Sequence, residues 1–167
     1  DDQDDTTDCD RECAIPRDNG SCAAYRYFRG NRPAVAEPWV SVAAGARGAR
    51  WLTSDWSWPE SWGVWSGGTD PVLSIPVPAT GVALRLDLDW FSAVPGMNVR
   101  VEVGGETHVV RFDPPAPRRQ TFAVKPTREP TLVVRFHLDR MSHAADGRTL
   151  GIGLGRVRLR AADQNLK

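Results

Sequence analysis

The sequence predicts an all-β fold, an antiparallel β-sandwich of the jelly-roll type with an irregular N-terminal extension. Apolar and polar residues alternate with a period of two over several short segments, which indicates strands with one buried face. Glycine and proline separate these segments, and the sequence shows no amphipathic helix longer than two turns. Short strands punctuated in this way are typical of sandwiches, and 167 residues suffice for one such domain.

The longest alternation lies in residues 82–90. Its apolar members are Val82, Leu84, Leu86, Leu88 and Trp90. The residues between them are Ala83, Arg85, Asp87 and Asp89. A strand with this pattern is expected to direct its apolar side chains into a core and its intervening side chains into solvent.

The clearest local signal is a β-hairpin over residues 99–112. Three valines alternate with polar residues over 99–103, Gly104 and Gly105 follow, and a second strand is expected over 107–112. Two glycines between two strands predict a tight turn, because both turn positions need a positive φ angle.

Two more strands are predicted over residues 121–124 and 131–138. Prolines lie on either side of them, at Pro114, Pro115, Pro117, Pro126 and Pro130. The expected buried face of the second strand consists of Leu132, Val134, Phe136 and Leu138. Both segments therefore extend the series of short antiparallel strands.

The last strand carries an irregularity. Ile152 and Leu154 are even-numbered, whereas the next apolar residues, Val157 and Leu159, are odd-numbered. A regular strand cannot place all four on one face, so we expect a β-bulge or bend near Gly155.

Three arginines alternate with the apolar residues of this last strand, at Arg156, Arg158 and Arg160. We expect them to form a solvated outer face of the strand. A contact with an acidic partner is the alternative.

Three regions are expected: a cysteine-containing extension over residues 1–35, a β-sandwich domain over 36–162 and a tail over 163–167. The first twelve residues hold seven acidic side chains and one arginine, and such a block normally stays solvated. The whole chain is balanced, with 21 basic and 21 acidic side chains. This balance argues against nucleic acid or anionic membrane as a partner, and no apolar run has the length of a membrane span.

Cys9, Cys13 and Cys22 all lie in the extension. Clustered away from the strands, they predict a disulfide formed in an oxidising compartment, and so a periplasmic or extracellular protein with its signal peptide removed. The odd count leaves one cysteine free or paired with another chain. A zinc site is the alternative, but no fourth Cys or His lies nearby.

Five of the seven tryptophans lie in residues 51–68, at Trp51, Trp56, Trp58, Trp62 and Trp65. An exposed indole can stack on the apolar face of a sugar ring while nearby polar groups bind its hydroxyls. The polar neighbours are Asp55, Ser57, Glu60 and Ser61. The same aromatic rings can instead close one end of a sandwich core, since an indole buries a large area. We expect most of them to be structural and one or two to form a binding platform.

Three strings of the sequence resemble a module found at the C-terminus of many bacterial envelope proteins. They are Trp56-Ser57-x-Pro59-Glu60-x-Trp62-Gly63-x-Trp65-Ser66-x-Gly68, then Val99-Arg100-Val101-Glu102-Val103-Gly104-Gly105, then Asp146-Gly147-Arg148-Thr149-Leu150-Gly151-Ile152-Gly153-Leu154. The host proteins are membrane glycosyltransferases, phosphoglycerol-transferase-like proteins and other polysaccharide-related proteins. The strings occur here in the family's order, and Asp55 stands where the family usually has glycine.

The resemblance implies a β-sandwich similar to carbohydrate-binding modules. It also implies that Trp56, Trp62 and Trp65, at fixed motif positions, are structural, whereas Trp58, at a variable position before Pro59, is the exposed member. The resulting glycan-binding candidates are Trp58, Asp55, Glu60 and Ser61. Because Glu60 recurs with Trp62 in the family, it is also expected to fix a turn by hydrogen bonding.

No catalytic residue is predicted. His108, His137 and His143 lack a Ser or Cys partner in a recognisable motif, which favours surface or structural roles, with His143 in a loop. The carboxyl groups of Asp55 and Glu60 could be imagined as the catalytic pair of a glycosidase. One such pair arises by chance among 21 acidic residues, so the sequence does not favour this hypothesis. No cofactor is expected. A structural Ca²⁺ ion stays an alternative, although the acidic start lacks the spacing of a calcium loop.

Two functions follow. The first is a non-catalytic extracytoplasmic module that binds a glycan at the bacterial envelope. The alternative is a structural accessory subunit that docks on an extracytoplasmic face of a larger membrane complex through its N-terminal extension.

Overall fold

The computed structural model describes residues 39–77 and 81–162. The predicted extension over 1–35, its cysteines Cys9, Cys13 and Cys22, and the tail over 163–167 lie outside the described residues. The disulfide and the extension therefore stay predictions.

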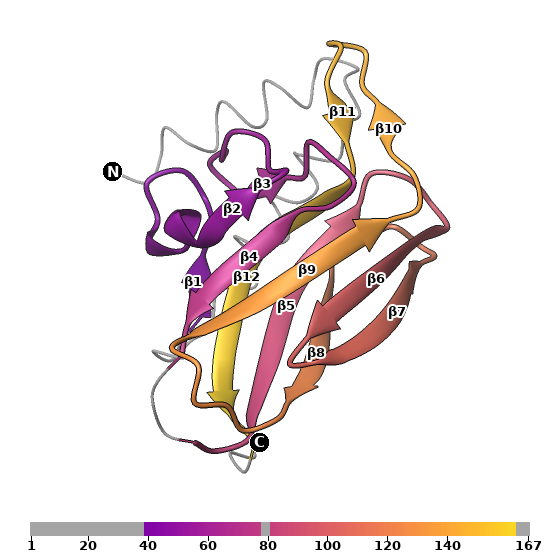
Figure 1. Ribbon diagram of the computed structural model, residues 1–167. Coiled ribbons are helices and arrows are strands. Elements are labelled where there is room, and N and C mark those ends of the chain that lie inside the picture. The colour runs from indigo at the N-terminus through magenta and orange to yellow at the C-terminus, as the bar shows by residue number, and fades with distance from the viewer. Residues whose placement is uncertain (1–38, 78–80, 163–167) are drawn as a thin grey trace.

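The described chain forms two antiparallel sheets that pack face to face as a β-sandwich (Figure 1). The first sheet has the order β1-β12-β5-β8, and β3 also pairs with β12. Its strands are β1 (Trp39–Ser41), β3 (Val64–Trp65), β5 (Leu84–Ser92), β8 (Arg118–Val124) and β12 (Ile152–Ala161). The predicted all-β sandwich is confirmed.

The second sheet has the order β2-β4-β9-β6-β7. Its strands are β2 (Leu52–Ser54), β4 (Val72–Pro76), β6 (Met97–Val103), β7 (Glu106–Phe112) and β9 (Thr131–Leu138). A short 3-10 helix, η1 (Arg47–Trp51), precedes β2, and β10 (Ser142–His143) pairs with β11 (Thr149–Leu150) in a small separate ladder. Among the described residues, no helix is long and apolar enough to cross a membrane.

The core fills the space between the sheets and follows the predicted alternation. Buried residues on β5 and β9 are Leu84, Leu86, Leu88, Trp90, Leu132, Val134, Phe136 and Leu138. Trp90 lies at the centre, with its ring centroid 4.7 Å from that of Phe112 and 5.8 Å from that of Phe136. Val82 was predicted to be buried and is 45% exposed, because β5 begins only at Leu84.

The hairpin and the bulge are both confirmed. Gly104 and Gly105 join β6 to β7 with φ angles of 58° and 77°, values that glycine adopts without strain. The register of β12 against β5 shifts between Leu154 and Arg156, which is the predicted irregularity at Gly155. The shift returns Val157 to the core face, where it is fully buried.

The outer face of the first sheet contradicts the prediction. Asp87 and Asp89 were expected in solvent, as were Arg156, Arg158 and Arg160, yet both aspartates are fully buried and the first two arginines are 7% and 5% exposed. The antiparallel register places Arg156 beside Asp89 and Arg158 beside Asp87.

Ion pairs offset the cost of burying these charges. Arg158 and Arg160 each donate from Nε to Asp87 Oδ2 at 2.8 Å. Arg156 pairs with Asp89 Oδ2, and Arg119 of β8 donates to Asp89 Oδ1 at 3.1 Å. Alternation by itself cannot distinguish such a paired, buried polar face from a solvated one, since both have a period of two.

Burial and hydrogen bonding shift the pKa of Asp87 in opposite directions. Burial raises this pKa, but hydrogen bonds from Arg160, Thr121 and Arg158 outweigh the burial and hold it below its ordinary value. Because the folded-state pKa is lower than the unfolded one, Asp87 stabilises the fold above the unfolded pKa. That contribution is lost as the pH falls through the folded pKa.

We predict that Asp87→Asn lowers the free energy of unfolding at neutral pH by roughly 3–5 kcal/mol, the usual cost of removing one partner from a buried ion pair. Urea unfolding followed by circular dichroism measures the loss. The difference from the wild type should shrink below about pH 4, where the unfolded carboxyl is protonated. Glu129→Gln, on an exposed residue, is the control and should change stability by less than about 0.5 kcal/mol. An equal loss for both variants would contradict a structural role for the buried pairs.

Candidate functional site

The tryptophan segment leaves β2 through a turn centred on Asp55. Asp55 has a φ angle of 59°, in the left-handed region that favours glycine but that aspartate tolerates. Its carbonyl oxygen accepts hydrogen bonds from the N–H groups of Gly67 (2.9 Å) and Gly68 (3.2 Å), and its Oδ2 accepts one from the N–H of Asp70 at 3.1 Å. Asp55 therefore closes the base of the loop.

The second half of the segment is packed into the protein. Trp62 and Trp65 are 6% and 0% exposed and form a small cluster with Phe91 and Leu150. The ring centroid of Trp65 lies 4.8 Å from that of Phe91 and 5.6 Å from that of Trp62. This cluster is separate from the main core around Trp90.

The tryptophan segment and the glycine-containing start of β12 approach each other too closely for side chains. A Cβ atom on Gly63 would lie 2.2 Å from the carbonyl oxygen of Leu154. One on Gly153 would lie 2.2 Å from the ring of Phe91 of β5, which packs against Trp62 and Trp65. Ser66 joins the two segments, because its Oγ accepts from the N–H of Ile152 at 2.9 Å and its own N–H donates to the Ile152 carbonyl at 2.8 Å. Two motifs about 85 residues apart in sequence therefore form one structural unit.

Glu60 belongs to this unit. Its N–H donates to the Gly63 carbonyl at 2.7 Å, and its carbonyl accepts from the N–H of Ala44 at 2.9 Å, so its backbone makes bonds at the turn. Its carboxylate lies 3.7 Å from the guanidinium of Arg148, which also pairs with Asp146 at 2.8 Å. Glu60 thus connects the first motif to the third.

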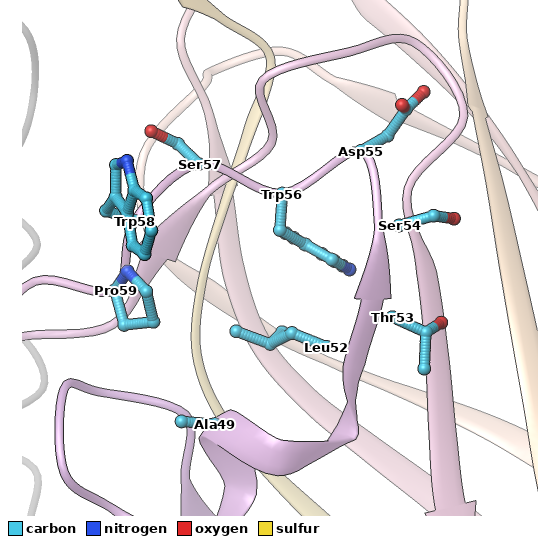
Figure 2. Close-up of a pocket in the computed structure, with 9 residues that line it drawn as sticks. All are labelled: Ala49, Leu52, Thr53, Ser54, Asp55, Trp56, Ser57, Trp58 and Pro59. Atoms are coloured by element: carbon cyan, nitrogen blue, oxygen red, sulfur yellow. The ribbon is translucent and has the colours of Figure 1, made fainter.

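A pocket of about 550 Å³ lies beside the first half of the segment. It is lined by Ala49, Leu52, Thr53, Ser54, Asp55, Trp56, Ser57, Trp58 and Pro59 (Figure 2). Trp56 is half-buried, its Nε1 donates to the Val72 carbonyl at 2.8 Å, and its ring packs edge-on against Phe136 with a centroid distance of 6.0 Å. Trp56 and Leu52 thus supply an apolar wall backed by the main core.

Trp58 forms the opposite side of the pocket together with Pro59, as Figure 2 shows. Its side chain is 88% exposed, the most exposed large apolar side chain among the described residues. The structure thus places this tryptophan in solvent, as expected from its variable motif position, and places Trp62 and Trp65 in the interior.

The four glycan-binding candidates do not all meet at the pocket. Asp55 and Trp58 line it, whereas Glu60 and Ser61 are not among its lining residues. In Figure 2 the Asp55 carboxylate points away from Trp58. Sequence reasoning missed Leu52, because its contribution depends on the pairing of β2 with β4, which no local pattern indicates.

The three histidines lie away from this pocket. His137 Nδ1 lies 2.6 Å from Asp70 Oδ1, His108 packs against Phe122 with a centroid distance of 5.3 Å, and His143 belongs to β10 rather than to the predicted loop. Within residues 39–77 and 81–162, no group of three or more His, Cys, Asp or Glu side chains is arranged to hold a metal ion.

Comparison with known proteins adds likenesses of fold. Neither a protein-family model nor a curated protein matches the sequence. Among solved structures, the xylan-binding module CBM15 is 11% identical, with 78% of this chain and 94% of that chain covered and a TM-score of 0.46. A CBM36 module in complex with calcium and xylotriose is 16% identical, with coverages of 65% and 91% and a TM-score of 0.42.

A match to part of a much longer protein is a family GH115 4-O-methyl-α-glucuronidase with specificity for decorated arabinogalactans. It is 11% identical with a TM-score of 0.43, and the match covers 60% of this chain but only 14% of the glucuronidase. At these identities and TM-scores the likeness extends no further than the general β-sandwich architecture.

We predict opposite stability effects for two tryptophans of the segment. Trp62→Ala should lower the free energy of unfolding by roughly 3–5 kcal/mol, the usual cost of emptying a buried aromatic site. Trp58→Ala, at an exposed position, should leave the melting temperature nearly unchanged. Thermal unfolding followed by circular dichroism compares them, and a comparable loss in both would show that Trp58 packs against the fold.

The packing of β12 against the Phe91 ring of the aromatic cluster is tested by adding one methyl group at Gly153. Gly153→Ala should destabilise the fold by roughly 1–3 kcal/mol, because the added carbon meets the Phe91 ring in a packed cluster. Gly67→Ala is the matched control, since the nearest atom to its added carbon is 3.6 Å away, an ordinary contact distance. Chemical denaturation of both variants measures the free energy of unfolding. A Gly153→Ala variant as stable as the wild type would mean that the aromatic cluster shifts to admit the methyl group without cost.

Proposed function

We propose that this protein is a non-catalytic, extracytoplasmic β-sandwich module that binds a glycan at the bacterial envelope through Trp58 and the adjoining pocket. The observation that carries the proposal is the 88% exposure of Trp58 beside a pocket of about 550 Å³, while Trp62 and Trp65 are packed inside.

The physical argument begins with the exposed indole. Its apolar surface contacts water in the free protein, so a ligand that covers it gains favourable hydrophobic free energy. The C–H face of a sugar ring is flat and apolar, and it fits an indole in this way. Leu52, Trp56 and Pro59 extend the apolar lining across the pocket.

The polar groups of the pocket favour a ligand with hydroxyl groups. Ser54 and Ser57 line it, and their hydroxyls can donate to or accept from a sugar. The indole N–H of Trp56 and the hydroxyl of Thr53 both donate to the Val72 carbonyl. These bonds hold the side of the pocket in place, and the two donors are not available to a ligand. A small number of polar groups around apolar surface is typical of ligand pockets.

The pocket chemistry supports binding without catalysis. Among the described residues, Asp55 is the only carboxylate that lines the pocket, whereas hydrolysis of a glycosidic bond normally uses two carboxyl groups that flank the bond. Glu60, the other member of the hypothetical pair, has its carboxylate beside Arg148.

A docking subunit is the second candidate, and the same exposed indole supports it. Tryptophan is a common anchor of protein interfaces, where it buries a large area at one point. In this case Trp58 would contact a protein of an extracytoplasmic complex, with residues 1–35 as the tether.

The test of glycan binding is a glycan array followed by calorimetric titration of any hit. Trp58→Ala should abolish binding with an unchanged melting temperature, and Trp58→Phe should retain part of it because an aromatic face remains. Val109→Ala, at a 70% exposed position on β7, is the control and should bind like the wild type. A wild-type protein that binds nothing on the array would discard the glycan proposal and favour the docking subunit.

A further inference from the structure

The Trp58 pocket is lined by one charged side chain. Among the nine lining residues Asp55 bears a carboxylate, and the others bear apolar groups, hydroxyls or an indole N–H (Figure 2). No arginine, lysine or histidine of the described chain belongs to this lining. An acidic ligand that enters the pocket therefore meets no cation there.

The basic residues of the described chain that are nearest to the segment in sequence are Arg47 and Arg50, both in η1. The guanidinium of Arg47 lies over Trp51, with its Cζ atom 6.0 Å from the ring centroid, and Trp51 does not line the pocket. Arg50 is exposed and is not a lining residue either. Neither arginine therefore supplies a counter-charge inside the pocket.

The Asp55 carboxylate is held in place without a cation. Its Oδ2 accepts from the N–H of Asp70 at 3.1 Å, and a Cβ atom on Gly68 would lie 2.5 Å from the same oxygen, so the carboxylate packs against this glycine. Asp55 forms no ion pair with any described residue. Because the carboxylate points away from Trp58 in Figure 2, its negative charge acts through space on a ligand that is stacked on the indole.

This arrangement of charge separates acidic sugars from uncharged ones. Removing a charged group from water costs free energy unless an opposite charge accompanies it, and a like charge nearby adds repulsion. An uncharged sugar avoids both costs, since its hydroxyls can exchange hydrogen bonds with Ser54 and Ser57. The whole chain holds 21 basic and 21 acidic side chains, so no excess of positive charge draws acidic ligands to it.

We propose that the ligand of the Trp58 pocket is a glycan without acidic groups, and that Asp55 is a residue that determines this specificity. The specificity rests on the proposed function, because it concerns the same pocket. It excludes uronate-containing and phosphate-bearing polymers as ligands. The indole of Trp58 supplies the stacking surface for the sugar, and the Asp55 charge disfavours the acidic competitors.

Pairs of oligosaccharides that differ only in charge test this proposal with the full chain. The uncharged probes are hexamers of β-1,4-linked glucose, mannose and galactose and of α-1,4-linked glucose. Each is paired with the derivative in which the free primary alcohols at carbon 6 are oxidised to carboxylates. Calorimetric titration of both members gives the ratio of their dissociation constants, and the uncharged member should bind at least about tenfold more tightly.

A protein that binds none of these probes would contradict the proposed function and this specificity together. A protein that binds an acidic member as tightly as its uncharged partner, or more tightly, would overturn the specificity alone and leave glycan binding standing. The ratio for the wild type should also fall between about 0.1 M and 1 M salt, where the screening length decreases from about 10 Å to about 3 Å. A ratio that does not change with salt would overturn the through-space role of the Asp55 charge.

Asp55→Asn separates this charge from the shape of the loop. Asparagine tolerates the positive φ angle and keeps an oxygen that accepts from the Asp70 N–H, so the turn is preserved while the charge is removed. The ratio should fall several-fold because the acidic member binds more tightly. Glu129→Gln, on an exposed residue that does not line the pocket, removes the same charge elsewhere and should keep the wild-type ratio. Thermal unfolding confirms that both variants are folded, and equal ratios in the two variants would overturn the role of Asp55.

Discussion

The close packing of the tryptophan segment against the start of β12 is the constraint on which the candidate site depends. Gly63 lets its backbone approach that of Leu154, and Gly153 leaves space for the Phe91 ring, which packs against Trp65. Because this contact fixes the far end of the segment while Asp55 closes its base, the residues between them are held in one path. Trp58 lies on that path with no place in the interior, and its exposure follows from the anchoring of its neighbours.

A second constraint concerns charge. The first sheet has its apolar face on the core and an ion-paired face on its outside, so its central strands β5 and β12 are buried on both faces. Each buried aspartate accepts from two arginines, and these pairs hold strands β5, β8 and β12 in register. A one-residue slip would place aspartates in the core, so these pairs specify the register as strictly as the apolar residues do.

The two surfaces have different chemistry and separate roles. The Trp58 pocket is apolar with a few hydroxyls, a composition that suits a neutral ligand with ring faces and hydroxyl groups. The outer face of the first sheet instead holds ion pairs between arginines and the buried Asp87 and Asp89. A module built in this way keeps its charge pairing away from its candidate binding site, so binding at Trp58 does not require the ion pairs to rearrange.

The sequence by itself determined strands β5 to β9 and β12, the Gly104-Gly105 hairpin, the bulge at Gly155 and the apolar side of those strands, because these depend on neighbours within a few residues. It also separated Trp58 from Trp62 and Trp65, by motif position. It did not predict β1 to β4, β10 or β11, which are short and show no sustained alternation. Only the tertiary structure decided that Glu60 pairs with Arg148 and that Leu52 lines the pocket. It also decided that Asp87 and Arg158 are buried. Those outcomes depend on which strand lies beside which, and the period of a strand is the same whether its polar face meets water or an oppositely charged partner.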